Sequence, residues 1–347
     1  MNLRIFQTNK IKPFLITFLS VGIFYWLPPF LFHSKTESKV LNFGFYYLSL
    51  NPFTKDTPWD QFLTPWFLYN TGFVSKPEDL VFILNVITIL AGVIFVGFIS
   101  FRFDWVLGLG ISLILASSPL FLIFQTWIGF SDPITFLILT LYLIFLFSEF
   151  NPKLKIFLLS FVLFLGMTNH FFQILILVIL LNVFYLIHYE NKSKILIFSF
   201  LLAIVLYGLF LVYLFKYSPI TWNQTRITIF SQMWGNEFIR MNQSEIFLGI
   251  VGLFHSLWPL VVYLIFRIPI SLLGFIFCYL VAMMTYDTSR IFAILSTPIL
   301  LFFTIQSSRM ASENEKRIWL LFSFLSPLIC KLYPLFYKWD GRIIYLQ

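Results

Sequence analysis

Runs of apolar residues about as long as a bilayer is thick recur along nearly the whole chain. A helix needs roughly twenty such residues to cross the hydrocarbon core, because each residue advances only about 1.5 Å and lipid cannot satisfy a free backbone group. This rule predicts about eleven membrane helices, at residues 13–32, 81–100, 106–125, 133–148, 156–168, 171–187, 195–215, 246–266, 269–285, 291–306 and 318–333. The expected fold class is an all-α, polytopic transmembrane helical bundle.

The composition excludes a sizeable aqueous domain. Hydrophobic residues make up 59% of the chain, charged residues only 11%, and the mean hydropathy is +0.89, far from the balance of a soluble domain. Residues 1–347 are therefore expected to form a single integral membrane domain. The 23 Lys and Arg are scattered over short loops, so the net positive charge indicates orientation in a membrane and no nucleic-acid partner.

The basic residues predict which side of the membrane each loop occupies. Arg4, Lys10 and Lys12 precede the first apolar run, which lacks a cleavage site, so we expect a cytoplasmic N-terminus. Two long segments, 33–80 and 216–245, then fall on the outside. They are rich in aromatic residues, which predicts interfacial helices in the first and fourth outside loops.

Two pairs of apolar runs are separated only by short polar tips. Residues 156–168 and 171–187 form one pair, and residues 269–285 and 291–306 form the other. Both pairs are expected to fold as tight helical hairpins. His255, which lies beside Ser256 inside another apolar run, is expected to hydrogen-bond a neighbouring helix.

Polar residues that are unusual for a membrane protein collect on the outer side of this predicted topology. Ionisable groups at the edge of a bilayer are unfavourable, and they usually face a cavity or one another. The candidate site residues are Asp56, Asp60, Asp132, Asn169, His170, Gln173, Asp287 and Arg290.

Asp56 and Asp60 lie four residues apart in the first long loop, beside Trp59. Transfer of a sugar to a hydroxyl needs a carboxylate that accepts the proton of the acceptor, so both are candidate catalytic bases. The alternative is that they are turn and cap residues of a surface loop.

Asp132 precedes Pro133 at the point where one apolar run ends and the next begins. An acidic residue followed by proline is a common helix start, which makes a helix cap the alternative to a binding role. One carboxylate can do both, since its second oxygen is left to point into a cavity.

Asn169, His170 and Gln173 lie at the tip of the first predicted hairpin. A histidine there can donate to a phosphate oxygen or act as an acid or base near neutral pH. The alternative is that it satisfies backbone carbonyls released by the turn.

Asp287 and Arg290 lie at the tip of the second predicted hairpin, three residues apart. At this spacing they share one face of a starting helix, so Asp287 can hold the guanidinium while Arg290 binds a phosphate through two hydrogen bonds. The alternative is a self-contained ion pair.

The chain resembles the GT-C superfamily of membrane glycosyltransferases. The resemblance rests on an inside N-terminus, a long first outside loop with Asp56 and Asp60, a turn at residues 129–133 that opens a helix, and polar outside tips. It implies transfer of a sugar from a polyprenyl-phosphate donor at the outer face of the membrane. It further implies that Asp56 or Asp60 is the base, while Arg290, assisted by His170, holds the phosphate. The chain departs from the family in lacking a paired acidic motif at the start of that loop and a soluble C-terminal domain.

Three other classes of function stay open at the level of the sequence. The first is a polysaccharide polymerase or ligase that acts on lipid-linked oligosaccharides, the second is a transporter or flippase, and the third is a structural membrane subunit. The expected partners are a polyprenyl-phosphate-linked sugar and membrane lipid. No metal site is predicted, and the sequence does not decide whether a divalent metal is needed. The expected location is a bacterial cytoplasmic membrane.

Overall fold

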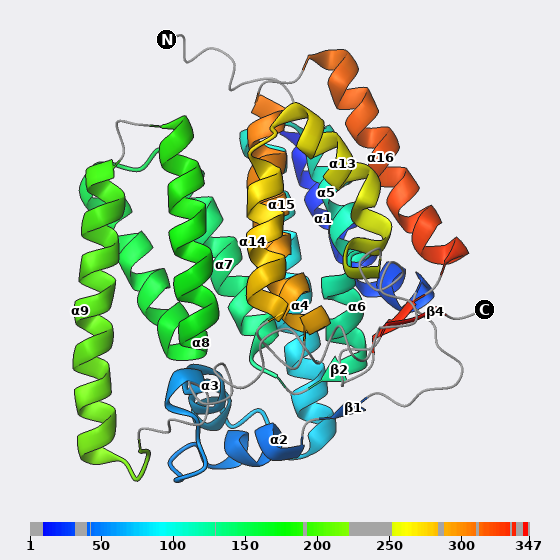
Figure 1. The fold of residues 1–347 in the computed structure, drawn as a ribbon. Coiled ribbons are helices and arrows are strands. Elements are labelled where there is room, and N and C mark those ends of the chain that lie inside the picture. Colours follow the sequence, from blue (N-terminus) through cyan, green and yellow to red (C-terminus); the bar gives the residue numbers. More distant parts are fainter. Residues whose placement is uncertain are drawn as a thin grey trace.

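The computed structural model describes residues 10–31, 40–41, 43–128, 130–189, 193–221, 252–283, 288–309, 312–333, 335–337 and 343–345. These residues are almost entirely helical (Figure 1). The principal helices are α1 (Ile11–Leu31), α4 (Pro77–Arg102), α5 (Trp105–Ala116), α6 (Pro119–Thr126), α7 (Asp132–Phe147), α8 (Pro152–His188), α9 (Ser193–Tyr217), α13 (Trp258–Arg267), α14 (Ser271–Met283), α15 (Thr288–Arg309) and α16 (Glu313–Leu332).

Shorter elements lie between or after these helices. The first predicted outside loop contains α2 (Phe43–Leu50), the single turn η2 (Trp59–Gln61) and α3 (Leu63–Thr71), and another single turn, η5 (His255–Leu257), precedes α13. Two very short strand pairs complete the described elements: β1 (Val40–Leu41) runs parallel to β2 (Trp127–Ile128), and β3 (Leu335–Tyr337) runs antiparallel to β4 (Ile343–Tyr345).

The helices identify the chain as a membrane protein. Among the described residues, five segments are long and apolar enough to cross a bilayer, namely α1, α4, α8, α9 and residues Arg290–Ser307 of α15. Four more apolar helices, Trp105–Ala116, Asp132–Phe147, Gly252–Arg267 and Ser271–Ala282, are shorter than this. Within the described residues the predicted apolar runs are mostly helical, apart from a break at Ser117 and Ser118 and from the ends of some runs. A count of about eleven crossings is not confirmed.

The predicted helix 106–125 is interrupted in the middle. It divides into α5 and α6 at Ser117 and Ser118, directly before Pro119. Proline lacks an N–H donor and disfavours helical geometry in the residue before it. The two serine hydroxyls donate to the carbonyls of Leu113 and Leu115, each over 2.7 Å, and so satisfy backbone groups at the break.

The predicted hairpin at residues 156–187 is confirmed. Its two runs form the single element α8, but the backbone at His170 leaves helical geometry (φ −158°, ψ 78°). A Cβ atom placed on Gly166 would lie 2.9 Å from Cγ2 of Ile174, whereas a straight helix would separate these residues by about 12 Å. The chain therefore folds back at His170, and the tip of the hairpin lies beside α3 (Figure 1).

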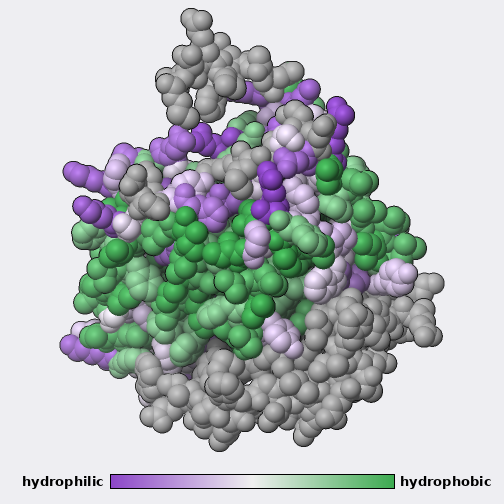
Figure 2. All heavy atoms as spheres, turned by 45° about the horizontal axis from the view of Figure 1, so that its top comes forward, coloured by the Kyte–Doolittle hydropathy of each residue, from purple (hydrophilic) through white to green (hydrophobic). Residues whose placement is uncertain are grey.

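The second predicted hairpin is formed by α14 and α15, which pack along each other. Its tip, including Asp287, lies outside the described residues. The span within α15 is 94% buried and forms the centre of the bundle, whereas α9 and α1 lie at its edges, with 22% and 28% of their spans buried. Figure 2 shows the resulting hydrophobic band, with hydrophilic residues gathered at one end of it.

Ion pairs mark the end of the bundle that lies away from the first loop. Arg102, at the end of α4, pairs with Glu149. Lys316 and Asp104 are 3.0 Å apart there, and Arg267 and Glu315 are 3.2 Å apart. These contacts join the ends of α4, α5, α13 and α16, so most of the charged side chains that the structure describes on these helices lie at the end opposite the hairpin tip.

His255 confirms its predicted role between helices. Its Nε2 donates to the carbonyl of Tyr333 at the end of α16, over 2.6 Å. Ser256 donates to the carbonyl of Ser117 at the break between α5 and α6, over 2.5 Å, and Ser326 of α16 donates to the carbonyl of Ser256, over 2.6 Å. The irregular turn η5 is thus joined to two neighbouring helical segments through polar groups.

Candidate functional site at the tip of the hairpin

The first loop places its two acidic candidates in different surroundings. The single turn η2 follows Pro58 and contains Asp60. Asp60 is buried, with only 1% of its surface exposed. Asp56, four residues earlier, lies exposed in the preceding turn. Of the two predicted catalytic carboxylates, the structure therefore brings only Asp60 into the interior.

His170 connects the hairpin tip to the same turn. Its Nε2 lies 3.0 Å from the amide nitrogen of Gln61, and the ring is largely buried. The two nitrogens lie within hydrogen-bond distance of each other, so the side chains of Gln61 and His170 join the turn η2 to the hairpin tip. His170 is thereby poised beside the turn that carries Asp60.

Asn169 fastens three helices together. Its side-chain nitrogen donates to the carbonyl of Ser131 over 3.2 Å and to the hydroxyl of Thr135 over 2.9 Å, while its side-chain oxygen accepts a hydrogen bond from Thr64. The residue is completely buried. Because both ends of the amide are engaged within the protein, its geometry is that of a cross-link between α3, α7 and α8.

Asp132 and Arg290 form a buried ion pair at the start of α7. Their nearest side-chain atoms are 3.4 Å apart, with 4% and 13% of the two side chains exposed. The guanidinium carbon also lies 4.0 Å from the ring centre of Phe130, a cation–π arrangement. Arg290 thus contacts the other candidate turn, residues 130–132, whereas its predicted partner, Asp287, lies outside the described residues.

A continuous series of contacts joins these groups. Asp60 precedes Gln61, whose side chain contacts His170. The neighbouring Asn169 hydrogen-bonds to Ser131, which precedes Asp132, and Asp132 forms an ion pair with Arg290. The parallel pairing of β1 with β2 brings the start of the first loop beside the same turn. The predicted candidates Asp60, Asp132, Asn169, His170 and Arg290 therefore gather at one end of the bundle.

Gln173 follows one turn after the hairpin tip and is 5% exposed. Neither its amide nitrogen nor its amide oxygen has a hydrogen-bond partner among the described residues. Buried polar groups in proteins nearly always have a partner, such as a water molecule or a ligand. Gln173 therefore remains a candidate for contact with a bound molecule.

Tyr207 of α9 adjoins the candidate cluster, and the sequence did not indicate this. Its ring stacks on Phe171, with ring centres 4.9 Å apart, and its phenol lies close enough to Asp60 for an electrostatic interaction. The hydroxyl is buried and has no hydrogen-bond partner within the described part of the chain. The sequence gives little indication of this position, because Tyr207 is one tyrosine in a run of apolar residues. Nothing in that run shows that Tyr207 faces the first loop.

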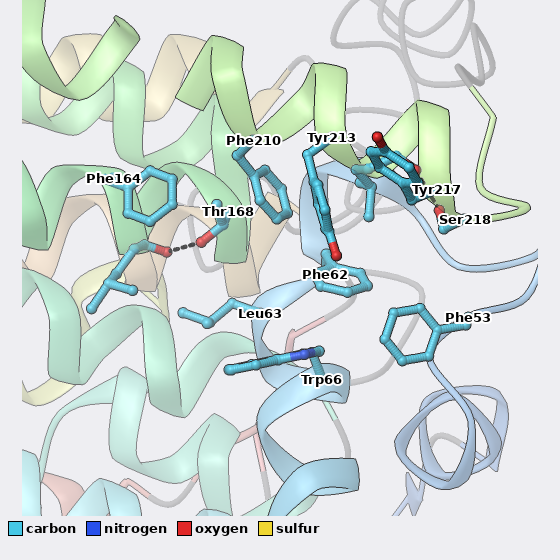
Figure 3. A pocket seen from close by; sticks show the side chains of 12 residues that line it. Phe53, Phe62, Leu63, Trp66, Phe164, Thr168, Phe210, Tyr213, Tyr217 and Ser218 are labelled. Carbon is cyan, nitrogen blue, oxygen red and sulfur yellow. Dashed lines mark hydrogen bonds between the residues drawn. The ribbon is translucent and has the colours of Figure 1, made fainter. Parts of the chain in front are cut away.

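A mostly apolar pocket of about 410 Å³ lies beside this polar cluster (Figure 3). The first arm of the hairpin contributes Phe164 and Thr168, and Thr168 directly precedes Asn169. The first loop, α3 and α9 provide the remaining walls with Phe53, Phe62, Leu63, Trp66, Phe210, Tyr213, Leu214, Tyr217 and Ser218, while Leu165 completes the lining. Phe62 follows Gln61 in the chain, so the pocket and the polar cluster share a wall.

Among the described residues, no group of three or more His, Cys, Asp or Glu side chains has an arrangement that could hold a metal ion. No protein-family model matches the sequence, and a search of curated proteins finds no significant match. The candidate site is therefore defined by its geometry.

Proposed function

We propose that the chain is a membrane glycosyltransferase that moves a sugar from a polyprenyl-phosphate donor to a lipid-linked or cell-envelope acceptor. The observation that most supports this proposal is that a carboxylate and a guanidinium lie in the same cluster of polar residues. A buried carboxylate, Asp60, and a buried guanidinium, Arg290, are connected through the hairpin tip at a single end of the bundle. Sugar transfer needs a base for the acceptor and a cation for the departing phosphate, and these two groups supply both.

Asp60 is the base in this proposal. The acceptor hydroxyl attacks the anomeric carbon, its proton passes to the Asp60 carboxylate, and the bond from that carbon to the phosphate oxygen breaks. Attack from the face opposite the phosphate inverts the anomeric centre. In this proposal His170, which contacts Gln61, and Tyr207, which interacts with Asp60, orient the reacting hydroxyl groups. The hairpin tip then also positions the substrate.

Arg290 stabilises the leaving phosphate. The phosphate departs with the bonding electron pair and gains negative charge, and a guanidinium can bind two of its oxygens at once. Asp132 and Phe130 fix the guanidinium from two directions. A fixed cation aimed at developing charge is often a large contribution to catalysis.

The proposed location is a bacterial cytoplasmic membrane, with the N-terminus in the cytoplasm and the site at the outer face. The ion-paired end that holds Arg102, Arg267 and Lys316 supports this orientation, because basic residues in short loops favour the cytoplasmic side.

Transfer from a radiolabelled polyprenyl-phosphate sugar by the purified, reconstituted protein tests the proposal. Asp60→Asn is expected to lower kcat by a factor of about 10² to 10⁴, the usual contribution of a general base. Glu78→Gln, a change at an exposed acid on the same side of the bundle, is the matched control and should leave the rate unchanged. Full activity of Asp60→Asn, or a larger loss in Asp56→Asn, would contradict the assignment of Asp60 as base.

A transporter or flippase is the second candidate function, and one observation favours it. The breaks at Ser117–Ser118 and at His255–Leu257 contact each other inside the bundle, and interrupted helices are common at transporter binding sites. Proteoliposomes that move a fluorescent polyprenyl-phosphate sugar across the bilayer without consuming it would favour this function over transfer.

A further inference from the structure

Helix α9 borders both the polar cluster and the aromatic pocket. Tyr207 interacts electrostatically with Asp60, and its ring centre is 6.2 Å from that of Phe210. Phe210, together with Tyr213 and Leu214 one turn later, lines the pocket. One face of one helix therefore links a charged group to an apolar space.

Exposed apolar residues of α9 lie next to residues that line the pocket. Of the lining residues on α9, Leu214 is buried, whereas Tyr213 is 63% exposed. The neighbouring outer face of α9, which includes Leu209 and Val212, is apolar and exposed.

The chemistry of the lining fits a hydrocarbon chain better than a sugar. Phenylalanine and leucine side chains make up most of the walls, and Figure 3 shows the rings of Phe53, Phe62 and Trp66 around the space. The hydroxyl of Thr168 already donates to the carbonyl of Leu165, over 2.9 Å. A sugar would leave its hydroxyl groups without partners in such a pocket, which is unfavourable.

We propose that the pocket and Tyr207 belong to one binding site for an amphiphile, with a single hydrocarbon chain of the lipid-linked substrate in the pocket and its polar head beside Asp60, His170 and Tyr207. A chain that ends at Thr168 places its head at the adjacent residues Asn169 and His170. There the head group gives the buried hydroxyl of Tyr207 a hydrogen-bond partner. This inference rests on the proposed function only for the identity of the head group.

Quenching of Trp66 fluorescence tests the chain-binding part. The protein is placed in nanodiscs of unbrominated phospholipid and titrated with a brominated single-chain alkyl phosphate, and the signal of Trp66 is taken as the difference from Trp66→Phe. We expect saturable quenching. Leu63→Phe, which fills the pocket, should weaken binding about tenfold, equivalent to about 1.4 kcal/mol. Leu209→Phe, on the exposed outer face of α9, is the matched control and should leave the affinity within about twofold.

Tyr207→Phe tests the head-group part. It should weaken binding of the alkyl phosphate about fivefold and leave binding of the corresponding alkyl alcohol unchanged, because only the phosphate offers strong acceptors to the phenol. Equal affinities of wild type and Tyr207→Phe for the phosphate would remove Tyr207 from the site.

Three results would overturn the pocket assignment. The first is quenching that does not saturate, the second is unchanged binding in Leu63→Phe, and the third is equal saturation by a brominated phospholipid, which would show that bulk lipid fills the pocket. The two proposals fail separately. Saturable binding without sugar transfer contradicts the glycosyltransferase function alone, whereas transfer that is unaffected by Leu63→Phe contradicts the pocket alone.

Discussion

At the scale of single residues, the buried ion pair of Arg290 and Asp132 makes the stability of the protein sensitive to substitution of either residue. Removing one partner of a buried ion pair leaves an uncompensated charge away from water, which costs about 3–5 kcal/mol. We therefore expect Arg290→Ala to lower the free energy of unfolding by about this amount, as measured by thermal or denaturant unfolding in detergent.

A double variant separates stability from chemistry at this pair. Asp132→Asn combined with Arg290→Gln removes both charges and keeps similar volumes, so it should recover most of the lost stability. It should not recover sugar transfer, because the cation is gone. A double variant as unstable as Arg290→Ala would show that the ion pair is not the reason for the loss.

His255 offers a second prediction at this scale, because its backbone is left-handed (φ 46°). This conformation is unfavourable for residues with a Cβ atom by about 1–2 kcal/mol, and glycine adopts it freely. Both His255→Gly and His255→Ala lose the hydrogen bond to Tyr333, so their difference isolates the backbone. His255→Gly should unfold at a higher temperature than His255→Ala, and the reverse order would mean that η5 rearranges.

At the scale of helices, the absence of a side chain at Gly108 lets α5 pack closely against α4. A Cβ atom on Gly108 would collide with the hydroxyl of Ser100 on α4 and would lie 3.3 Å from the backbone oxygen of Val96. Gly108→Ala should therefore destabilise the fold by about 1–3 kcal/mol, the usual effect of overpacking. Thermal unfolding of the purified protein measures this change.

Gly208 of α9 is the matched control, since a Cβ atom there would meet nothing within 4 Å. Gly208→Ala should be neutral or raise stability by about 0.5–1 kcal/mol through lower entropy of the unfolded chain. Adding Ser100→Gly to Gly108→Ala should restore part of the loss. Equal effects of the two alanine substitutions would contradict the packing of α5 against α4.

Helices and hairpins were predictable from the sequence because their signals are local. Apolar runs gave the positions of the helices, and the polar tip at residues 168–170 gave the reversal of α8. The break at Ser117 was not predicted, because a serine pair before proline also occurs in kinked but continuous helices. The number of crossings depends on where each short helix lies in the bilayer, which apolarity alone does not determine.

The candidate site was predictable in its members but not in its connections. The sequence placed Asp60, His170 and Arg290 on one side, and the structure brings them to one end of the bundle. It could not show that Asp60 is buried while Asp56 is exposed, or that Arg290 pairs with Asp132. Those facts depend on contacts between segments far apart in the chain.

At the scale of the whole molecule, the bundle has two chemically different ends, and this predicts its orientation. Asp56 lies exposed near the candidate site, and 78% of the Glu149 side chain is exposed at the ion-paired end. The native Cys278 and Cys330 are both buried, so they should not react with a thiol reagent. A cysteine introduced at the surface can then be labelled selectively. In intact cells, a membrane-impermeant maleimide should label Asp56→Cys, and it should label Glu149→Cys only after permeabilisation.

The unsubstituted protein should stay unlabelled in both conditions, which serves as the control. The opposite pattern would place the candidate site on the cytoplasmic side. Labelling of both variants in intact cells would mean that the chain does not separate its two ends across the bilayer.

Asn169 also has a mechanical consequence. Its single amide holds Thr64 on one side and Ser131 with Thr135 on the other, so the walls that carry Asp60 and Asp132 are clamped to one another. A displacement of α3 would therefore strain the hydrogen bonds from Asn169 to Ser131 and Thr135 beside Asp132, the ion-pair partner of Arg290. In the proposed transferase, this coupling would let a substrate bound beside Asp60 affect the position of Arg290.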